Sequence, residues 1–379
     1  MRKRSWALAV FLAAAVAVPG AARGEKPDDR GSDRRVTVMT RNLYLGADVS
    51  PAIAAIGSGN PATIFSAVSE VWAKVRFTDF PARARGLARE IEEAQPDLIG
   101  LQEAELWRSQ TPADFIPGNA HHVQYDFVAI LLRALRERGL HYAVVAEETG
   151  LDAEFPGFLS QADAASGTLS DIRLTEREVI LARTDLRTSD LKLTNPQTGH
   201  FVTNVEFEVA PGVTFVVLRG WASVDANVRG KSFRFVTTHL EADSEGVREA
   251  QAIEVIAGPA NTPLPVILVA DSNSNANGDL TTPAYGAFVG AGFADAWREA
   301  HPGRIASTCC NAELLTNPFF PSPSDNEGRI DLVLYRGAGD FRTLDVDLLG
   351  AGPFDRVFNG QAFLWHSDHA GVAATLRLR

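Results

Sequence analysis

Asp271 and Asn273 directly follow a short, wholly apolar run, P-V-I-L-V-A, at residues 265–270. A short run of this kind, rich in β-branched residues, predicts a strand that is buried on both faces. A carboxylate and an amide at the carboxyl end of a rigid strand are well placed for catalysis, although Asp-x-Asn is also common in turns. The rest of the chain favours the catalytic interpretation.

Polar side chains also stand beside the ends of other apolar strands, which are predicted at residues 36–40, 97–103, 178–182, 232–238, 329–335 and 371–378. Oxygen ligands suit a hard divalent cation, histidines can handle protons and phosphate oxygens, and an amide can orient water. Such a set is what metal-assisted phosphoester hydrolysis requires. The set consists of Asn42, Glu103, His239, Asp271, Asn273, Asp331, Asp368 and His369.

Most of these residues also have an ordinary structural explanation. Asparagine is common as a turn cap, histidine occurs in protein cores, and aspartate forms surface ion pairs, so each residue type is expected without a functional site as well. The joint occurrence of all of them is what favours a site. The structural alternatives are a turn cap at Asn42, a solvated helix beginning at Glu103 and Glu105, a hydrogen-bonded core His239, a pair between Asp331 and Arg329 or Arg336, and a surface turn at Ser367-Asp368-His369.

The elements that must position these residues include more strands than helices. Amphipathic helices are predicted at residues 81–95, 125–138 and 247–257, and in the first of them Arg83 is expected to point away from the core. Residues 51–69 are expected to be loop with some helix, 151–170 loop, and 307–327 a long irregular loop. Several strands follow one another without a helix, which favours one α+β domain with stacked sheets and outer helices over a doubly wound sheet.

The two cysteines of the chain, Cys309 and Cys310, are adjacent. They cannot connect distant parts of the chain by a disulfide. A vicinal disulfide and two free thiols both fit the sequence, while a zinc site is disfavoured because no further cysteine or nearby histidine pair is available.

The N-terminus has the pattern of a secretory signal peptide at residues 1–24, with a basic start, an apolar core and Ala22-Arg23-Gly24 before the expected cleavage site. A flexible leader is expected at residues 25–35. Cleavage would remove Arg2, Lys3, Arg4 and Arg23 and no acid, which changes the formal net charge from −11 to −15. A protein of this charge has no long-range attraction for nucleic acid or anionic lipid. The expected location is secreted or periplasmic.

Six motifs occur in the order V-M-T-R-N, L-I-G-L-Q-E, T-T-H-L, V-A-D-S-N, R-I-D-L-V and S-D-H. This ordered set resembles the endonuclease/exonuclease/phosphatase superfamily, which includes DNase I-like nucleases, abasic-site endonucleases, neutral sphingomyelinases and inositol-polyphosphate 5-phosphatases. The resemblance covers residues 36–379. It implies a DNase I-like, four-layer α/β/β/α sandwich, in which two packed mixed sheets are flanked by helices. Ala270 stands where many members have glycine, a change that keeps the residue small.

The resemblance also implies a role for each candidate residue. Asn42 and Glu103 would hold Mg²⁺ or Mn²⁺, with Asp368 close to the same site. Asp271 would orient or deprotonate the attacking water, and Asn273 would help to position it. The two histidines would contact the phosphate. Glu176 would be the partner of His239, although Glu178 is nearby. Asp331 would hydrogen-bond His369, which fixes its orientation and favours its charged form.

The function implied is that of a secreted metal-dependent phosphoesterase, expected to be a monomer without stable membrane insertion. Nucleic acid, phospholipid and small phosphate esters all remain open as substrates, and Arg219-Gly220-Trp221 could line the substrate cleft or bury its tryptophan. An inactive binding module on the same scaffold would be expected to lose some of the catalytic residues, yet all are present. A Ser-His-Asp hydrolase is disfavoured because the sequence contains no G-x-S-x-G.

Overall fold

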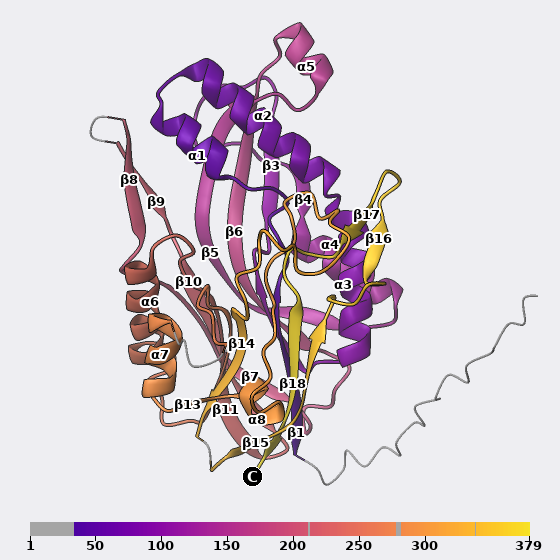
Figure 1. Cartoon of the computed structure of the whole chain (residues 1–379), viewed down its shortest axis with the longest axis vertical. Helices are drawn as coiled ribbons and strands as arrows, with labels where there is room; N and C mark the ends of the chain where they lie inside the picture. Colours follow the sequence, from indigo (N-terminus) through magenta and orange to yellow (C-terminus); the bar gives the residue numbers. More distant parts are fainter. Residues whose placement is uncertain (1–33, 211–212, 278–281, 338) are drawn as a thin grey trace, which may run out of the picture. The chain divides into compact units, whose positions relative to one another are not determined.

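A large mixed β-sheet carries the N-terminal half of the fold (Figure 1). The computed structural model describes residues 34–210, 213–277, 282–337 and 339–379. In these ranges the sheet consists of β1 (Arg35–Asn42), β2 (Leu98–Gln102), β3 (Leu106–Gln110), β4 (His122–Asp126), β5 (Tyr142–Gly157), β6 (Ser170–Arg183), β15 (Phe341–Leu349) and β18 (Gly371–Leu378). The strand order is β15-β18-β1-β2-β6-β3-β4, with β5 also paired to β6, and β1 and β2 are parallel.

A second mixed sheet carries most of the C-terminal half. It consists of β7 (Lys192–His200), β10 (Gly220–Val228), β11 (Lys231–His239), β12 (Val266–Asp271), β13 (Phe293–Asp295) and β14 (Asp331–Arg336), in the order β13-β14-β12-β11-β10-β7. Strands β11 and β12 are parallel, and β12 and β14 are antiparallel. Two hairpins lie outside both sheets: β8 (Val205–Ala210) with β9 (Val213–Val217), and β16 (Arg356–Phe358) with β17 (Phe363–Trp365).

Helices cover the outer faces of both sheets (Figure 1). The first sheet is covered by α2 (Pro61–Phe77), α3 (Phe80–Ala94) and α4 (Phe127–Glu137), and the second by α6 (Glu245–Ala257) and α7 (Pro283–Gly290). The remaining helices are α1 (Ser50–Gly57), α5 (Gln161–Ser166) and α8 (Ala296–Ala300). The predicted four-layer α+β architecture is confirmed. None of the helices that the structure describes is long and apolar enough to cross a membrane.

The continuous apolar runs in the sequence arise because each central strand contributes to two cores. In β12, Ile267 and Val269 point into the core between the two sheets, whereas Val266 and Leu268 pack beneath α6 and α7. The two sheets approach closely at Gly100 of β2, where a Cβ atom would lie 2.4 Å from the side chains of Thr237 and Val269. A residue without a side chain is therefore required at this point.

Residues 34–379 form one compact unit, and the predicted strands and helices of the core are present. Several loop predictions were wrong. Most of residues 51–69 lies in α1 and α2, and β5 continues to Gly157 instead of giving way to a loop at residue 151. The long strand is stabilised by pairing with β6, where Arg173 neutralises the otherwise unfavourable Asp152. The expected signal peptide and residues 25–33 of the leader lie outside the described residues, and Arg35 already belongs to β1.

The prediction that Arg83 points to solvent was also wrong, because this side chain is fully buried. Its guanidinium donates hydrogen bonds to the carbonyl oxygens of Leu43 (2.5 Å), Tyr44 (3.0 Å), His366 (3.0 Å) and Thr78 (3.0 Å). Burial lowers the pKa of Arg83 to about 10. The buried arginine therefore connects helix α3 to the two loops that follow Asn42 and precede Asp368.

Arg41 and Glu90 form a buried ion pair next to the end of β1 and the start of β18. The Glu90 carboxylate accepts hydrogen bonds from Arg41 at 2.9 and 3.0 Å and lies 2.6 Å from His366 Nδ1. The same Arg41 side chain donates to the carbonyl oxygen of His369 at 2.6 Å. Burial alone would raise the pKa of Glu90, but Arg41 and His366 together lower it below its ordinary value of 4.5.

Glu90→Gln is expected to lower the free energy of unfolding by about 3–5 kcal/mol, because Arg41 would remain buried without its counter-charge. The full difference in the free energy of unfolding is expected above pH 4.5. It should shrink as the pH falls through the lowered pKa of Glu90, because the wild-type carboxylate is then protonated and no longer pairs with Arg41. Urea unfolding at several pH values measures both effects. Glu93→Gln on the exposed face of α3 is the matched control, and equal stability of Glu90→Gln and wild type would contradict the interpretation.

Candidate functional site

Three of the predicted site residues lie side by side across the second sheet. His239 at the end of β11 is directly opposite Asp271 at the end of β12, and Asp271 is directly opposite Asp331 at the start of β14. The side chains converge because parallel neighbours end at the same edge of a sheet and an antiparallel neighbour begins there. His239 Nε2 lies 3.5 Å from Asp271 Oδ2.

The first sheet contributes Asn42, the last residue of β1, and Glu103, which follows the parallel strand β2. Asn42 Nδ2 donates to Glu103 Oε1 at 2.8 Å and to Asp271 Oδ2 at 2.9 Å. The second oxygen of Glu103 accepts from the backbone N–H of Leu45 at 2.7 Å. The amide of Asn42 therefore joins the two sheets at the site.

His369 lies against Asp331, as the sequence predicted, with 2.8 Å between His369 Nδ1 and Asp331 Oδ2. Asp271 Oδ2 lies 3.7 Å from the same nitrogen. Burial alone would lower the pKa of His369, but Asp331, Asp271 and Asp368 together raise it well above 6.5. The imidazole is therefore held in its charged form and can stabilise a negative oxygen.

Two carboxylates of β6, Glu176 and Glu178, face the Nδ1 atom of His239. Glu176 Oε1 lies 3.2 Å from His239 Nδ1, and Glu178 Oε1 lies 3.8 Å from it. On the other side of the ring, Asn273 Nδ2 lies 3.1 Å from His239 Nε2 and donates to the Leu240 carbonyl at 2.8 Å. Of the two acids that the sequence offered as partners of His239, Glu176 is the closer.

Asp271 is the most connected carboxylate of the site. Its Oδ1 accepts from the backbone N–H of Asn273 at 3.1 Å, and its Oδ2 accepts from Asn42. Burial alone would raise the pKa of Asp271, but His239, His369 and the Asn42 amide hold it below 3.8. Asp271 is therefore ionised at neutral pH and can accept a proton or orient a water molecule.

Two residues of the site have a left-handed backbone, namely Glu103 with φ of +50° and Asn273 with φ of +47°. Asparagine tolerates this conformation well, whereas for glutamate it costs roughly 1–2 kcal/mol. Strain of this kind persists where the surrounding structure imposes it. Here it turns the Glu103 carboxylate back toward Asn42.

The carboxylate oxygens of Glu103 and Asp271 fit a hard divalent cation. The Asn42 amide turns its nitrogen toward them, and its oxygen accepts from the backbone N–H of Tyr44 at 2.8 Å. Burial raises the pKa of Asp368 to about 6; the charge of His369 opposes this rise, and that of Glu103 adds to it. The ligand atoms of Glu103, His239 and Asp271 lie within 4.8 Å of one another, and those of Asp271, Asp331 and His369 form a similar group. Asp368 belongs to no such group among the described residues. The predicted ligand Glu103 thus lies in one group with Asp271 and His239, to which Asn42 is hydrogen-bonded.

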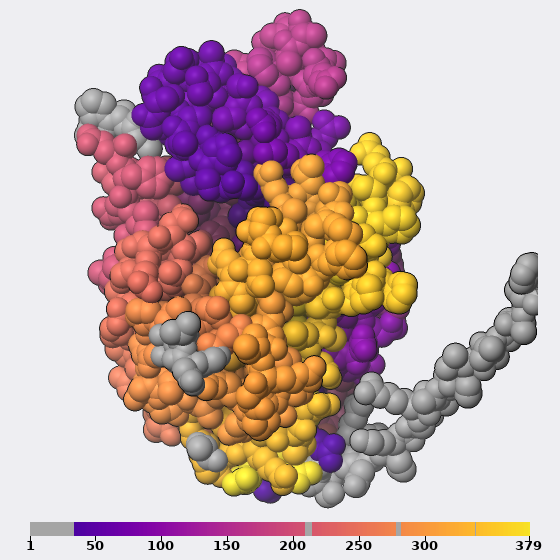
Figure 2. All heavy atoms as spheres, viewed as in Figure 1, coloured from indigo at the N-terminus to yellow at the C-terminus, as the bar shows by residue number. Residues whose placement is uncertain are grey.

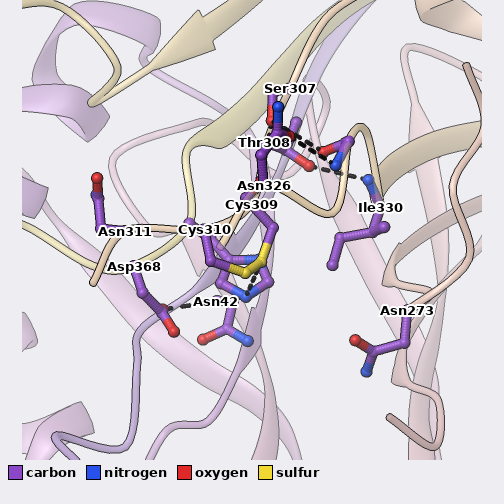
Figure 3. The surroundings of a disulfide bond; sticks show 12 residues. Asn42, Asn273, Ser307, Thr308, Cys309, Cys310, Asn311, Asn326, Ile330 and Asp368 are labelled. Carbon is purple, nitrogen blue, oxygen red and sulfur yellow. Dashed lines mark hydrogen bonds and ion pairs between the residues drawn. A yellow bond between two sulfur atoms is a disulfide. The ribbon is translucent and has the colours of Figure 1, made fainter. Parts of the chain in front are cut away.

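The two cysteines form a vicinal disulfide, which the sequence had left undecided against two free thiols. Figure 3 shows Asn42, Asp368 and Asn273 around the pair. Cys309 Sγ lies 3.5 Å from His369 Nε2, and the 307–327 loop is joined to the S-D-H segment by a hydrogen bond of 2.7 Å from Asn311 N–H to the Asp368 carbonyl. The cysteines are therefore part of the wall of the site.

A cavity of about 760 Å³ opens at the site, and Figure 2 shows the surface hollowed where the indigo, salmon and orange segments meet. The site residues that line it are Glu103, Glu176, His239, Asp271, Asn273, Asp368, His369 and both cysteines. Sequence reasoning missed Glu105, which is fully buried rather than solvated and has no hydrogen-bond partner for its carboxylate in the described chain. Burial, reinforced by Glu176 and Glu103, raises the pKa of Glu105 well above 4.5. No local pattern distinguishes such a residue from an exposed glutamate.

Arg219 lines this cavity, so the Arg219-Gly220-Trp221 segment places its arginine at the site. Its guanidinium lies 3.2 Å from Glu176 Oε1 and 3.6 Å from Glu241 Oε2. Trp221 is half-buried and packs against the core beneath α6 and α7. The arginine belongs to the site, and the tryptophan stabilises the sheet behind it.

Comparison with known proteins shows the family and the fold of the chain. The sequence model of the Endonuclease/Exonuclease/phosphatase family matches residues 65–369. A search of curated proteins found no significant match. Similar solved structures include family proteins from Bacteroides vulgatus (17% identity, 91% of this chain and 99% of that chain, TM-score 0.52) and Bacteroides thetaiotaomicron (15%, 91% and 98%, 0.51). At this level of identity, the likeness concerns the fold.

Proposed function

The chain belongs to the endonuclease/exonuclease/phosphatase family, and from this premise we propose that it is a divalent-metal-dependent phosphoesterase. Members of this family hydrolyse phosphoesters. The observation that carries the proposal is the convergence of one amide, several carboxylates and two histidines from both sheets within hydrogen-bond reach of one another. An inactive binding module would not require this complete set.

Each side chain has a role that follows from its surroundings. Asp271, held ionised, would orient the attacking water and accept its proton, with Asn273 fixing the position of that water. His369, held cationic, would donate to a phosphoryl oxygen, and His239 would contact the same phosphate with its orientation set by Glu176. This arrangement supports attack in line with the leaving oxygen.

Glu103 would hold the metal ion, with Asp271 and Asp368 in the same region, and Asn42 would join them by turning its amide oxygen toward the two carboxylates. We propose Mg²⁺ or Mn²⁺ because the donors are hard oxygens. When bound, such an ion neutralises charge on the phosphoryl oxygens and lowers the barrier to attack.

We further propose that the protein is exported through the signal peptide at residues 1–24. The vicinal disulfide supports this proposal, since disulfides persist in oxidising compartments. N-terminal sequencing of the mature protein would test the cleavage before Glu25.

The test of the proposed activity is phosphate or alcohol release from a panel of phosphodiesters and phosphomonoesters by the purified mature protein. Turnover is expected to stop in EDTA and to return when Mg²⁺ or Mn²⁺ is added in excess. Glu103→Gln should weaken the binding of Mn²⁺ measured by calorimetry, whereas Glu93→Gln should not. Full turnover in EDTA would contradict metal dependence, and a folded, metal-loaded protein without turnover on any ester would favour the binding module.

A further inference from the structure

A second, wholly apolar cavity adjoins the catalytic cavity. It has a volume of about 60 Å³ and is lined by side chains of α1, α2, β3, β5, β6 and β9. Val49, Ile53, Leu151 and Leu174 border both cavities. Because the same four side chains border both spaces, a molecule that fills the catalytic cavity can extend into this second cavity, which we call the apolar groove.

The groove lies between the α1–α2 segment and the strands β5 and β6, next to the β8–β9 hairpin (Figure 1). On the hairpin side, the ring of Phe215 lies 6.3 Å from that of Phe155 and 5.2 Å from that of Phe207. Val205, Phe207 and Val217 extend the same apolar wall into the catalytic cavity. A continuous apolar surface thus leads away from the catalytic residues in one direction.

The charged residues of the catalytic cavity restrict the charge of the part of the ligand that lies outside the metal site. Apart from its histidines, the basic residue among the described residues that line it is Arg219, which already pairs with Glu176. Carboxylates such as Asp48, Asp243 and Glu327 line the rim. Nucleic-acid binding proteins meet phosphates that flank the reacting one with lysine and arginine. This rim offers flanking phosphates no such partner.

We propose that the substrate is an amphiphilic phosphoester, with one phosphate at the metal site and a hydrocarbon group in the adjoining groove. The part of the substrate that meets the rim is uncharged or cationic. This inference rests on the proposed phosphoesterase function and names the substrate class of the same site. Because a water-sized group needs roughly 10–15 Å³ measured in this way, the groove accepts roughly four to six carbon atoms.

The test uses straight-chain alkylphosphonates, from methyl to octyl, which carry the phosphate-like group but are not phosphoesters. Their binding to the full-length mature protein in excess Mn²⁺ is measured by calorimetry and needs no turnover. Each buried methylene strengthens binding by up to about fourfold. We therefore expect at least about a tenfold gain in affinity from methyl- to butylphosphonate, with a plateau near six carbons, the estimated capacity of the groove.

Ala153→Phe is designed to fill the groove, and Phe215→Ser to remove apolar surface from its hairpin side, away from the catalytic cavity. Both should flatten the dependence on chain length while leaving the affinity for methylphosphonate unchanged. Ala62→Phe, at an exposed position of α2, is the matched control and should behave as wild type. The second groove variant keeps the test valid if the first one does not fold.

Three results would overturn the inference. Equal affinity along the series would show that the groove takes no chain, and an unaltered dependence in both groove variants would place the chain elsewhere. Faster turnover of oligonucleotides than of alkyl phosphodiesters would exclude the substrate class. In each of these cases, metal-dependent turnover of a short ester would leave the phosphoesterase function standing. Conversely, chain-dependent binding without hydrolysis of any ester would contradict the phosphoesterase and not the groove.

Discussion

Asp271→Asn is expected to fold normally and to lose turnover by about 10²–10⁴-fold, the range in which a general base contributes. The amide has nearly the same shape and can still accept from the Asn273 N–H, but it can neither accept a proton nor carry charge. Asp271 Oδ2 also accepts from Asn42 and lies 3.5 Å from His239, so the change removes the central acceptor of the site. Initial rates with saturating metal measure the loss.

The control for this variant is Asp325→Asn, which removes an exposed carboxylate from the rim of the same cavity. It changes the net charge equally and should keep turnover close to wild type. Circular dichroism and thermal unfolding establish that both variants are folded. If Asp271→Asn turned over substrate like Asp325→Asn, Asp271 would not be the base.

His369→Ala is expected to lower turnover by about 10²–10³-fold, the typical cost of removing one donor that stabilises transition-state charge. The reason is the loss of the imidazolium that Asp331, Asp271 and Asp368 stabilise. His121→Ala, at an exposed position of the chain, serves as the control and should be fully active.

Asp331→Asn separates orientation from direct catalysis. Asp331 acts through His369, at 2.8 Å from its Nδ1, so its loss should reduce turnover less than His369→Ala does. Because Asp331 helps to raise the pKa of His369, the variant should lose activity at a lower pH than wild type as the imidazolium deprotonates. An unchanged pH profile in Asp331→Asn would contradict the coupling between the two residues.

The vicinal disulfide belongs to the site because Cys309 Sγ contacts His369 Nε2. The sequence established that the two cysteines are adjacent and nothing about their surroundings. Isolated loop residues carry no periodicity from which their neighbours can be inferred. The long 307–327 loop was predicted correctly as irregular, and the structure adds that it folds over the catalytic edge.

The central strands could be predicted because each one is apolar on both faces. In the structure, β2, β12 and β14 are almost wholly buried, and the polar residues at their ends mark the edge where the sheets meet the cavity. The same local logic failed at β5. There, Asp152 and Glu154 resemble a loop in sequence, and the strand depends on pairing with the distant β6.

The sequence by itself determined an α+β arrangement of stacked sheets and eight candidate side chains, because strand burial and strand-end polarity can be recognised in short stretches of residues. The four-layer class and the role of Glu176 came from the family resemblance. Only the tertiary structure decided that Glu105 and Arg83 are buried, that Arg219 faces the catalytic residues, and that an apolar groove adjoins them. Each of these features depends on side chains from elements far apart in the chain. Their proximity is set by strand register and by the packing of helices on sheets, which no local pattern encodes.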